Sequence, residues 1–174
     1  MSNFIGNSNI IKGYIGSTEV KKIYFGNKEI YSGGNQFYLD FNSLDGWTHE
    51  HTGSTTYSQV LVSEYVTNFN KGCIKIQADT NLQNWIYKTF DFSGINKIKL
   101  VFQLFGNTDA QAYGRVLIGG VQKFEQKAGT ISGAQEVVID VSDITGPQEL
   151  RFVATKDQNW GAATWFHIST LTSI

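Results

Sequence analysis

The sequence predicts an all-β protein, in which a small N-terminal β-hairpin module precedes an antiparallel two-sheet jelly-roll β-sandwich. Three observations predict this class. The 174 residues include 12 Phe, 8 Tyr and 18 Gly but a single Pro, a composition that suits short strands joined by tight turns. A ten-residue motif is repeated near the N-terminus. Apolar and polar residues alternate through most of the remaining chain, which is typical of strands with one buried face.

The first element is the repeat, in which residues 11–20 align with residues 21–30. Each copy predicts a strand, a turn and a strand, because glycine followed by Ser or Asn allows the positive φ angles of a tight hairpin. Two hairpins of this size cannot bury a core of their own. The module should therefore lie on another surface, either the C-terminal domain of the same chain or another protein. The aligned positions are Lys12/Lys22, Tyr14/Tyr24, Gly16/Gly26, Glu19/Glu29 and Val20/Ile30.

The second copy, VKKIYFGNKEIY over residues 20–31, resembles a KKIY-x-G-N segment found near the N-terminus of structural proteins of tailed bacteriophages. The resemblance implies a virion protein of the tail, baseplate, head-fibre or decoration type, and it implies no catalytic residue. It further implies synthesis in the cytoplasm of a bacterial host, location in the virion, and a homo-oligomer or many copies per particle. Residues 1–34 would then dock to other virion proteins through Tyr14, Gly16, Tyr24, Gly26 and Tyr31.

A small, flexible segment, SGGN at residues 32–35, follows the repeat and places the domain boundary there. We therefore expect a docking module over residues 1–34 and the sandwich over residues 35–174. Alternation predicts roughly eight or nine strands in the sandwich and no amphipathic helix. The expected strands lie at 37–42, 60–66, 73–78, 84–92, 98–104, around 116–118, 137–141, 150–154 and 166–170.

Three later segments, WIYKTFDF at 85–92, 140–152 and WFHIS at 165–169, are similar to the jelly roll of carbohydrate-binding modules. Because one fold hosts many functions, the likeness implies sugar binding without fixing it. The leading interpretation is a virion structural or decoration protein whose jelly roll is displayed outward and binds host-surface glycans. The alternative is a stand-alone carbohydrate-binding module, and a carbohydrate-active enzyme is the third hypothesis.

Charge and motifs favour neither catalysis nor binding to nucleic acid or membranes. The formal net charge of -1 supplies no field that would attract nucleic acid or an anionic membrane. Cys73 is the single cysteine and is expected to be a packed side chain, since the Gly-x-Ser-x-Gly nucleophile motif is absent. His49 and His51 have no apparent third ligand, so a solvated loop is favoured over a metal site. His167 is interpreted as a structural or ligand-facing residue rather than a base.

No cofactor is expected, although a structural calcium ion remains an option. Jelly-roll sugar modules often hold such an ion with carboxylate and backbone oxygens. Asp40, Asp79 and Asp157 could contribute, but isolated aspartates are more often turn residues.

Aromatic side chains supply the candidate glycan site. Sugars stack their C–H faces on rings while amides and carboxylates bind the hydroxyl groups. Trp160, with Asn159 and Asp157, lies in a glycine-bearing segment and is the main candidate. Trp85 and Tyr87 share a strand face and are second candidates, open between core and surface. Trp165 is expected in the core, where large aromatic residues usually lie.

Overall fold

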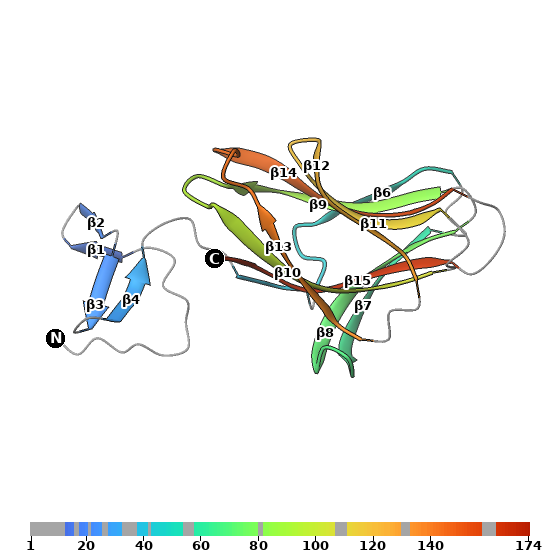
Figure 1. Ribbon diagram of the computed structural model, residues 1–174, viewed down its shortest axis with the longest axis horizontal. Helices are drawn as coiled ribbons and strands as arrows, with labels where there is room; N and C mark the ends of the chain where they lie inside the picture. Colours follow the sequence, from blue (N-terminus) through green and yellow to red (C-terminus); the bar gives the residue numbers. More distant parts are fainter. Residues whose placement is uncertain are drawn as a thin grey trace.

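The computed structural model describes residues 13–15, 18–20, 22–25, 28–32, 38–41, 43–53, 58–79, 82–106, 111–129, 133–157 and 163–174. These residues form β-strands, turns and irregular segments, without a helix (Figure 1). None of them therefore belongs to a helix long and apolar enough to cross a membrane. The expected all-β class is confirmed.

The ten-residue repeat forms two antiparallel hairpins, as expected. The first pairs β1 (Gly13–Ile15) with β2 (Thr18–Val20), and the second pairs β3 (Lys22–Phe25) with β4 (Lys28–Ser32). Tyr14 pairs with Glu19 and Tyr24 pairs with Glu29, so these corresponding positions are paired in the same way. A bulge after Ile23 shifts the outer pairs of the second hairpin by one residue. Tyr31 lies in β4, whereas Gly16 and Gly26 lie outside the described residues.

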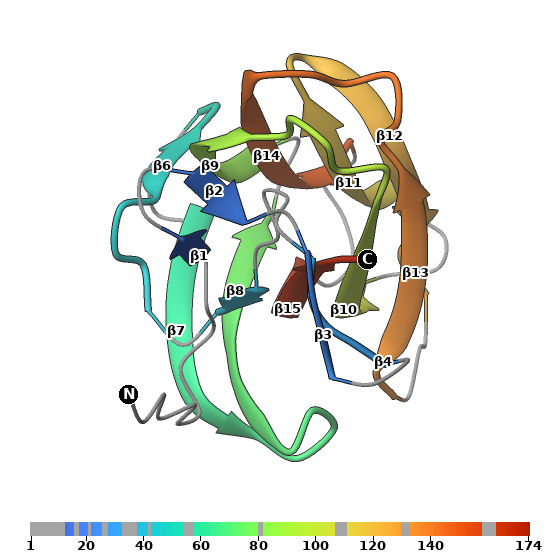
Figure 2. The ribbon, with the colours of Figure 1, turned by 90° about the vertical axis from the view of Figure 1, so that its left-hand side faces the viewer.

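The sandwich consists of two antiparallel sheets that face each other (Figures 1 and 2). The five-stranded sheet has the order β12-β11-β14-β9-β6, and the six-stranded sheet has the order β13-β10-β15-β8-β7, with β5 also paired to β15. The first sheet contains β6 (Thr48–His51), β9 (Leu82–Asp91), β11 (Ala112–Ile118), β12 (Val121–Lys127) and β14 (Pro147–Lys156). The second contains β5 (Tyr38–Asp40), β7 (Ser58–Val66), β8 (Lys71–Ala78), β10 (Lys97–Phe105), β13 (Gln135–Asp140) and β15 (Thr164–Ser173).

Two of these strands, β6 and β12, were not expected from the sequence. The segment with His49 and His51 was expected to be a loop, but it is the edge strand β6 and pairs with β9. Its side chains are mostly exposed, so the apolar alternation that marks a strand is missing there. β12 is likewise mostly exposed at the opposite edge. Pairing rather than burial defines both edge strands.

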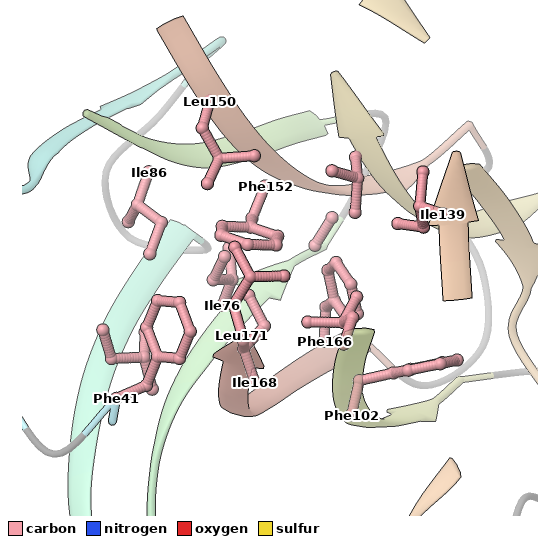
Figure 3. Close-up of a cluster of buried hydrophobic side chains, with 14 of the residues drawn as sticks. Phe41, Ile76, Ile86, Phe102, Ile139, Leu150, Phe152, Phe166, Ile168 and Leu171 are labelled. Atoms are coloured by element: carbon pink, nitrogen blue, oxygen red, sulfur yellow. The ribbon is translucent and has the colours of Figure 1, made fainter. Parts of the chain in front are cut away.

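The core lies between the sheets and is rich in aromatic rings (Figure 3). On β10 the expected apolar positions Ile98, Leu100, Phe102 and Leu104 are buried, while Lys97 and Lys99 are exposed or half-buried. The alternation is interrupted at Gln103, which is fully buried as well. Phe152 from the five-stranded sheet lies 6.3 Å from Phe166 of the six-stranded sheet, measured between ring centroids. Truncating such a ring to alanine costs about 4 kcal/mol. Rings from both sheets therefore hold the layers together.

Candidate functional site

The outward face of the five-stranded sheet carries Trp85 and Tyr87. Both lie in β9, where Asn84 and Ile86 are fully buried and point toward the other sheet. Because side chains alternate along a strand, Trp85 and Tyr87 point away from the core, and both are half-buried. The structure thus resolves the choice left open by the sequence in favour of the surface.

Arg151 lies between these two rings. It pairs directly with Tyr87 across β14 and β9, while Val153 pairs with Trp85. The Cζ atom of Arg151 is 5.4 Å from the Trp85 ring centroid and 5.5 Å from the Tyr87 ring centroid. A guanidinium group at this distance is attracted to the negative face of an aromatic ring. One cation therefore orients both aromatic side chains.

Two carboxylates fix the positions of Arg151 and Tyr87. Arg151 donates from Nη2 and Nε to Oε1 of Glu149, at 2.7 Å and 2.9 Å. The Tyr87 hydroxyl donates to Oε1 of Glu50 at 2.9 Å, and this bond raises the pKa of Tyr87 above its usual value. We call Glu50, Trp85, Tyr87, Glu149 and Arg151 the Trp85 face. Three strands, β6, β9 and β14, supply its side chains.

A row of residues, most of them polar, extends this face across the whole sheet. Register places Glu125, Arg115, Val153, Trp85 and Glu50 side by side on five consecutive strands. Arg115 repeats the arrangement around Arg151, since its Cζ lies 5.0 Å from the Tyr113 ring centroid and its Nε 2.5 Å from Glu125 Oε2. Four interstrand spacings correspond to about 19 Å. The row across the five strands is therefore long enough for an extended ligand.

Of the three residues that the sequence suggested as the main glycan site, the structure describes only Asp157. Asn159 and Trp160 lie outside the described residues. Asp157 is exposed just after β14, and its backbone N–H donates to the carbonyl of Gln111 at 3.0 Å. The structure therefore brings Trp85 and Tyr87 together, whereas the Trp160 site stays a prediction.

Trp165 does not lie in the core, so that expectation is wrong. In β15 the buried residues Phe166 and Ile168 point inward. The alternation turns Trp165 and His167 to the outward side of the six-stranded sheet, where both are half-buried. The large size of Trp165 favours a core position, but the alternation of side chains along β15 decides which side of the sheet it faces.

The remaining reactive side chains have local partners or are buried. His49 Nε2 lies 2.6 Å from Asn84 Oδ1, and the ring centroids of His49 and His51 are 5.7 Å apart. Burial raises the pKa of the Cys73 thiol to about 11, which disfavours the reactive thiolate. Cys73 is fully buried, as expected for a packed side chain.

Two of the three calcium candidates form ion pairs. Asp40 Oδ1 lies 2.9 Å from Lys71 Nζ, and Asp79 Oδ1 lies 2.6 Å from Lys156 Nζ. Among the residues that the structure describes, no group of three or more His, Cys, Asp or Glu is placed to hold a metal ion. A structural calcium ion thus stays the option that the sequence left, beside the expectation of no cofactor.

Sequence reasoning missed Glu50, Glu149 and Arg151. The outward positions of Glu149 and Arg151 follow from their alternation with Leu150 and Phe152, which are buried. Their proximity to Trp85 and Tyr87 depends on pairing between β14 and β9, which are separated by four intervening strands in the chain. Alternation within one segment carries no information about that pairing.

No protein-family model matches the chain, and no curated protein matches it. Among solved structures, the K2 cleaved adhesin domain of Lys-gingipain aligns with a TM-score of 0.56 at 13% identity, covering 80% of this chain and 99% of that one. The Caldicellulosiruptor saccharolyticus module CBM27-1, in complex with mannohexaose, aligns with a TM-score of 0.55 at 14% identity, covering 79% and 96%. TmCBM61, in complex with β-1,4-galactotriose, aligns with a TM-score of 0.50 at 11% identity, covering 76% and 92%.

These likenesses establish the fold. The chain shares the jelly-roll β-sandwich of carbohydrate-binding modules, as the resemblance of residues 85–92, 140–152 and 165–169 implied. They give no support to the bacteriophage resemblance, which rests on the N-terminal repeat. At identities this low a shared fold leaves the function to be argued from the site.

Proposed function

We propose that the sandwich is a non-catalytic carbohydrate-binding domain that holds an oligosaccharide on the Trp85 face. The observation that carries this proposal is the position of Arg151, which lies over the rings of Trp85 and Tyr87 while Glu149 binds its guanidinium group. Apolar ring surfaces and polar groups therefore converge on one outward face. That combination suits a ligand with apolar C–H faces and many hydroxyl groups.

Preorganisation favours binding on this face. Tyr87 is held by Glu50 and Arg151 by Glu149, so the polar groups are already in place before a ligand arrives. Tryptophan and tyrosine lose little side-chain entropy because each has only two χ angles. The free energy lost on ordering the site is therefore small.

The row across the sheet favours an oligosaccharide over a single sugar. Arg115 and Glu125 lie two and three strands from Trp85, on the same outward side. An oligosaccharide that lies across the strands could contact Trp85 and Arg115 at the same time. The neighbours CBM27-1 and TmCBM61, which were solved with mannohexaose and β-1,4-galactotriose, support a neutral oligosaccharide as the ligand class.

Calorimetric titration of the full chain with mannohexaose, β-1,4-galactotriose and a panel of neutral oligosaccharides tests the proposal. Trp85→Ala should weaken binding roughly tenfold, since stacking and burial of one ring together contribute more than 1 kcal/mol. Val138→Ala is the control, because Val138 is an exposed apolar residue on β13 of the other sheet. If no neutral oligosaccharide binds, or if the two variants bind equally, the proposal is wrong.

A second proposal concerns residues 1–34, which we infer to dock the protein to a larger assembly, as the resemblance to tailed-bacteriophage virion proteins implies. The supporting observation is that the repeat forms two hairpins with strands of three to five residues. Isolated hairpins of this size are at best marginally stable in water. A partner surface would supply the missing contacts, and the sandwich would then be displayed outward from a particle.

A further inference from the structure

The outward side of the six-stranded sheet carries a second group of aromatic and polar side chains. Phe105, Trp165 and Gln77 are directly paired neighbours on β10, β15 and β8. His167 and Lys75 are direct partners in the adjacent row of the same strands. All five side chains are half-buried. We call this group the Trp165 face, and it lies on the opposite side of the sandwich from the Trp85 face.

The aromatic rings of the Trp165 face are packed around His167. The ring centroids of Phe105 and His167 are 5.0 Å apart, and those of Trp165 and His167 are 6.1 Å apart. Both contacts are edge-to-face, with interplanar angles of 66° and 76°. Such packing restrains the rings at the surface. Trp165 therefore presents a fixed, partly exposed ring rather than a mobile one.

Amide groups border these rings. Gln77 lies between Trp165 and the exposed Gln59, which is its direct partner on β7. On the other row, Asn68 in the turn between β7 and β8 donates to Oε1 of Gln103 at 3.0 Å. Gln103 is the direct partner of His167. Gln77 and Gln59 thus provide hydrogen-bonding groups beside Trp165 while Gln103 is already occupied.

Lys75 supplies the charge of this face. It makes no ion pair within the described part of the chain, whereas Lys71 is paired with Asp40 and Lys99 with Glu136 on the same sheet. Burial, together with the positive charge of Lys75, lowers the pKa of His167 to about 4. His167 is therefore neutral at pH 7. Its direct partners on the neighbouring strands, Leu61 and His167, and its same-side neighbours on β8, Cys73 and Gln77, carry no carboxylate to balance it.

We propose that the Trp165 face is a second binding site, which takes a carboxylated sugar such as a uronate residue of an acidic polysaccharide. The sugar ring stacks on Trp165, its carboxylate pairs with Lys75, and its hydroxyl groups bind Gln77 and Gln59. A hydrogen bond from Lys75 to a charged carboxylate is stronger than one to a neutral hydroxyl group. The site therefore selects acidic over neutral sugars. This inference goes beyond the proposed function, because it uses the other sheet and a different class of ligand.

The test is titration of the full chain with trigalacturonate, with galactotriose as the neutral counterpart. Trigalacturonate should bind, and rising salt concentration should weaken this binding. Lys75→Met keeps the apolar stem and removes the charge, so it should weaken trigalacturonate binding roughly tenfold. The matched control is Lys99→Met, which removes a lysine already paired with Glu136 on the same sheet and should leave the affinity unchanged. Trp165→Ala should weaken binding as well, and the indole N–H resonance of Trp165 should shift on titration.

Several results would overturn the proposal. One is that trigalacturonate does not bind. Another is that galactotriose shifts the Trp165 indole N–H resonance with the same affinity as trigalacturonate. A third is that Lys75→Met binds trigalacturonate with unchanged affinity. The Trp85 variant separates this site from the first, because Trp85→Ala should weaken neutral-oligosaccharide binding and leave trigalacturonate binding intact. A negative result for uronate binding at the Trp165 face therefore leaves the proposal for the Trp85 face unaffected, and the reverse also holds. Lys75→Met also decides the question if Trp165→Ala fails to fold.

Discussion

Lys156 is fully buried, and its Nζ donates to Oδ1 of Asp79 at a distance of 2.6 Å. The lysine ends β14 on the inner side of the five-stranded sheet, and Asp79 follows β8 of the other sheet. The pair therefore links the two layers at one end of the sandwich. Burial of an ammonium group costs free energy, and a hydrogen-bonded carboxylate compensates part of the lost hydration.

Asp79→Asn should destabilise the protein by about 3 kcal/mol, because it leaves the buried ammonium group of Lys156 without its carboxylate. The double variant Asp79→Asn with Lys156→Met should recover part of that loss, since it also removes the charge. Urea unfolding of the three proteins measures both effects. A change in stability within about 0.5 kcal/mol for Asp79→Asn would mean that the pair contributes little.

Calcium should not be needed for stability. Lys71 and Lys156 already supply positive charge to Asp40 and Asp79, two of the three candidate ligands. Removal of divalent ions with a chelator should therefore leave Tm unchanged. A lower Tm after chelation that calcium restores, and magnesium does not, would establish a structural site.

Stability should fall as the pH decreases from about 6.5 to about 4, in part because of His167. Its pKa is lowered to about 4 in the folded state by burial and by Lys75, so in this window the unfolded chain binds a proton that the folded protein excludes. Discounted for the partial exposure of the ring, the effect should be about 2 kcal/mol. His167→Gln should show a smaller loss between pH 7 and pH 4.5 in urea unfolding. An equal loss in both proteins would assign the effect to other groups.

Trp160 remains a candidate for glycan binding in its own right. If it stacks on a sugar, Trp160→Ala should weaken binding about fivefold, which corresponds to roughly 1 kcal/mol for one ring. Tm should stay unchanged, because a surface ring contributes little to the core. Glycan-array binding and a melting curve, compared with those of Trp85→Ala, show whether the two residues act on the same ligands. A large drop in Tm would instead place Trp160 in the core.

Removal of residues 1–34 should leave the sandwich folded and abolish incorporation into a larger assembly. The described core residues all lie between Phe41 and Leu171, so the sandwich retains its buried contacts. Near-ultraviolet circular dichroism reports the fold, and co-sedimentation with the assembled particle reports docking. Normal incorporation of the shortened chain, or its unfolding, would contradict the docking proposal.

The sequence predicted those parts of the fold that depend on local pattern. The buried positions of β10 and the two hairpins follow from alternation and from a repeat that any reader of the sequence can align. The edge strand β6 could not be found this way, because an exposed strand shows no apolar alternation. Residue size predicts a core position for Trp165, but Phe166 and Ile168 point inward, and the alternation along β15 therefore turns Trp165 outward.

The candidate site was predictable only in part, for a different reason. Trp85 and Tyr87 could be placed on one face from their spacing, but Arg151 comes near them only through the pairing of β9 with β14. Contacts between distant strands depend on the topology of the whole sheet. The sequence of one strand shows which of its own side chains share a face, but it does not show which residues of other strands lie beside them.

The two hairpins share the cross-strand pairs Tyr14–Glu19 and Tyr24–Glu29, ten residues apart. The next pairs, Ile15–Thr18 and Phe25–Lys28, also correspond, and a bulge distinguishes the second copy. Each ten-residue unit therefore contains the pairs next to its own turn, whereas the outer pairs of the second hairpin, Ile23–Tyr31 and Lys22–Ser32, extend beyond residue 30. Duplication or deletion of one whole unit would change the number of hairpins without altering the pairing inside any other. The number of hairpins could in this way differ by whole units without any change in the sequence of the sandwich.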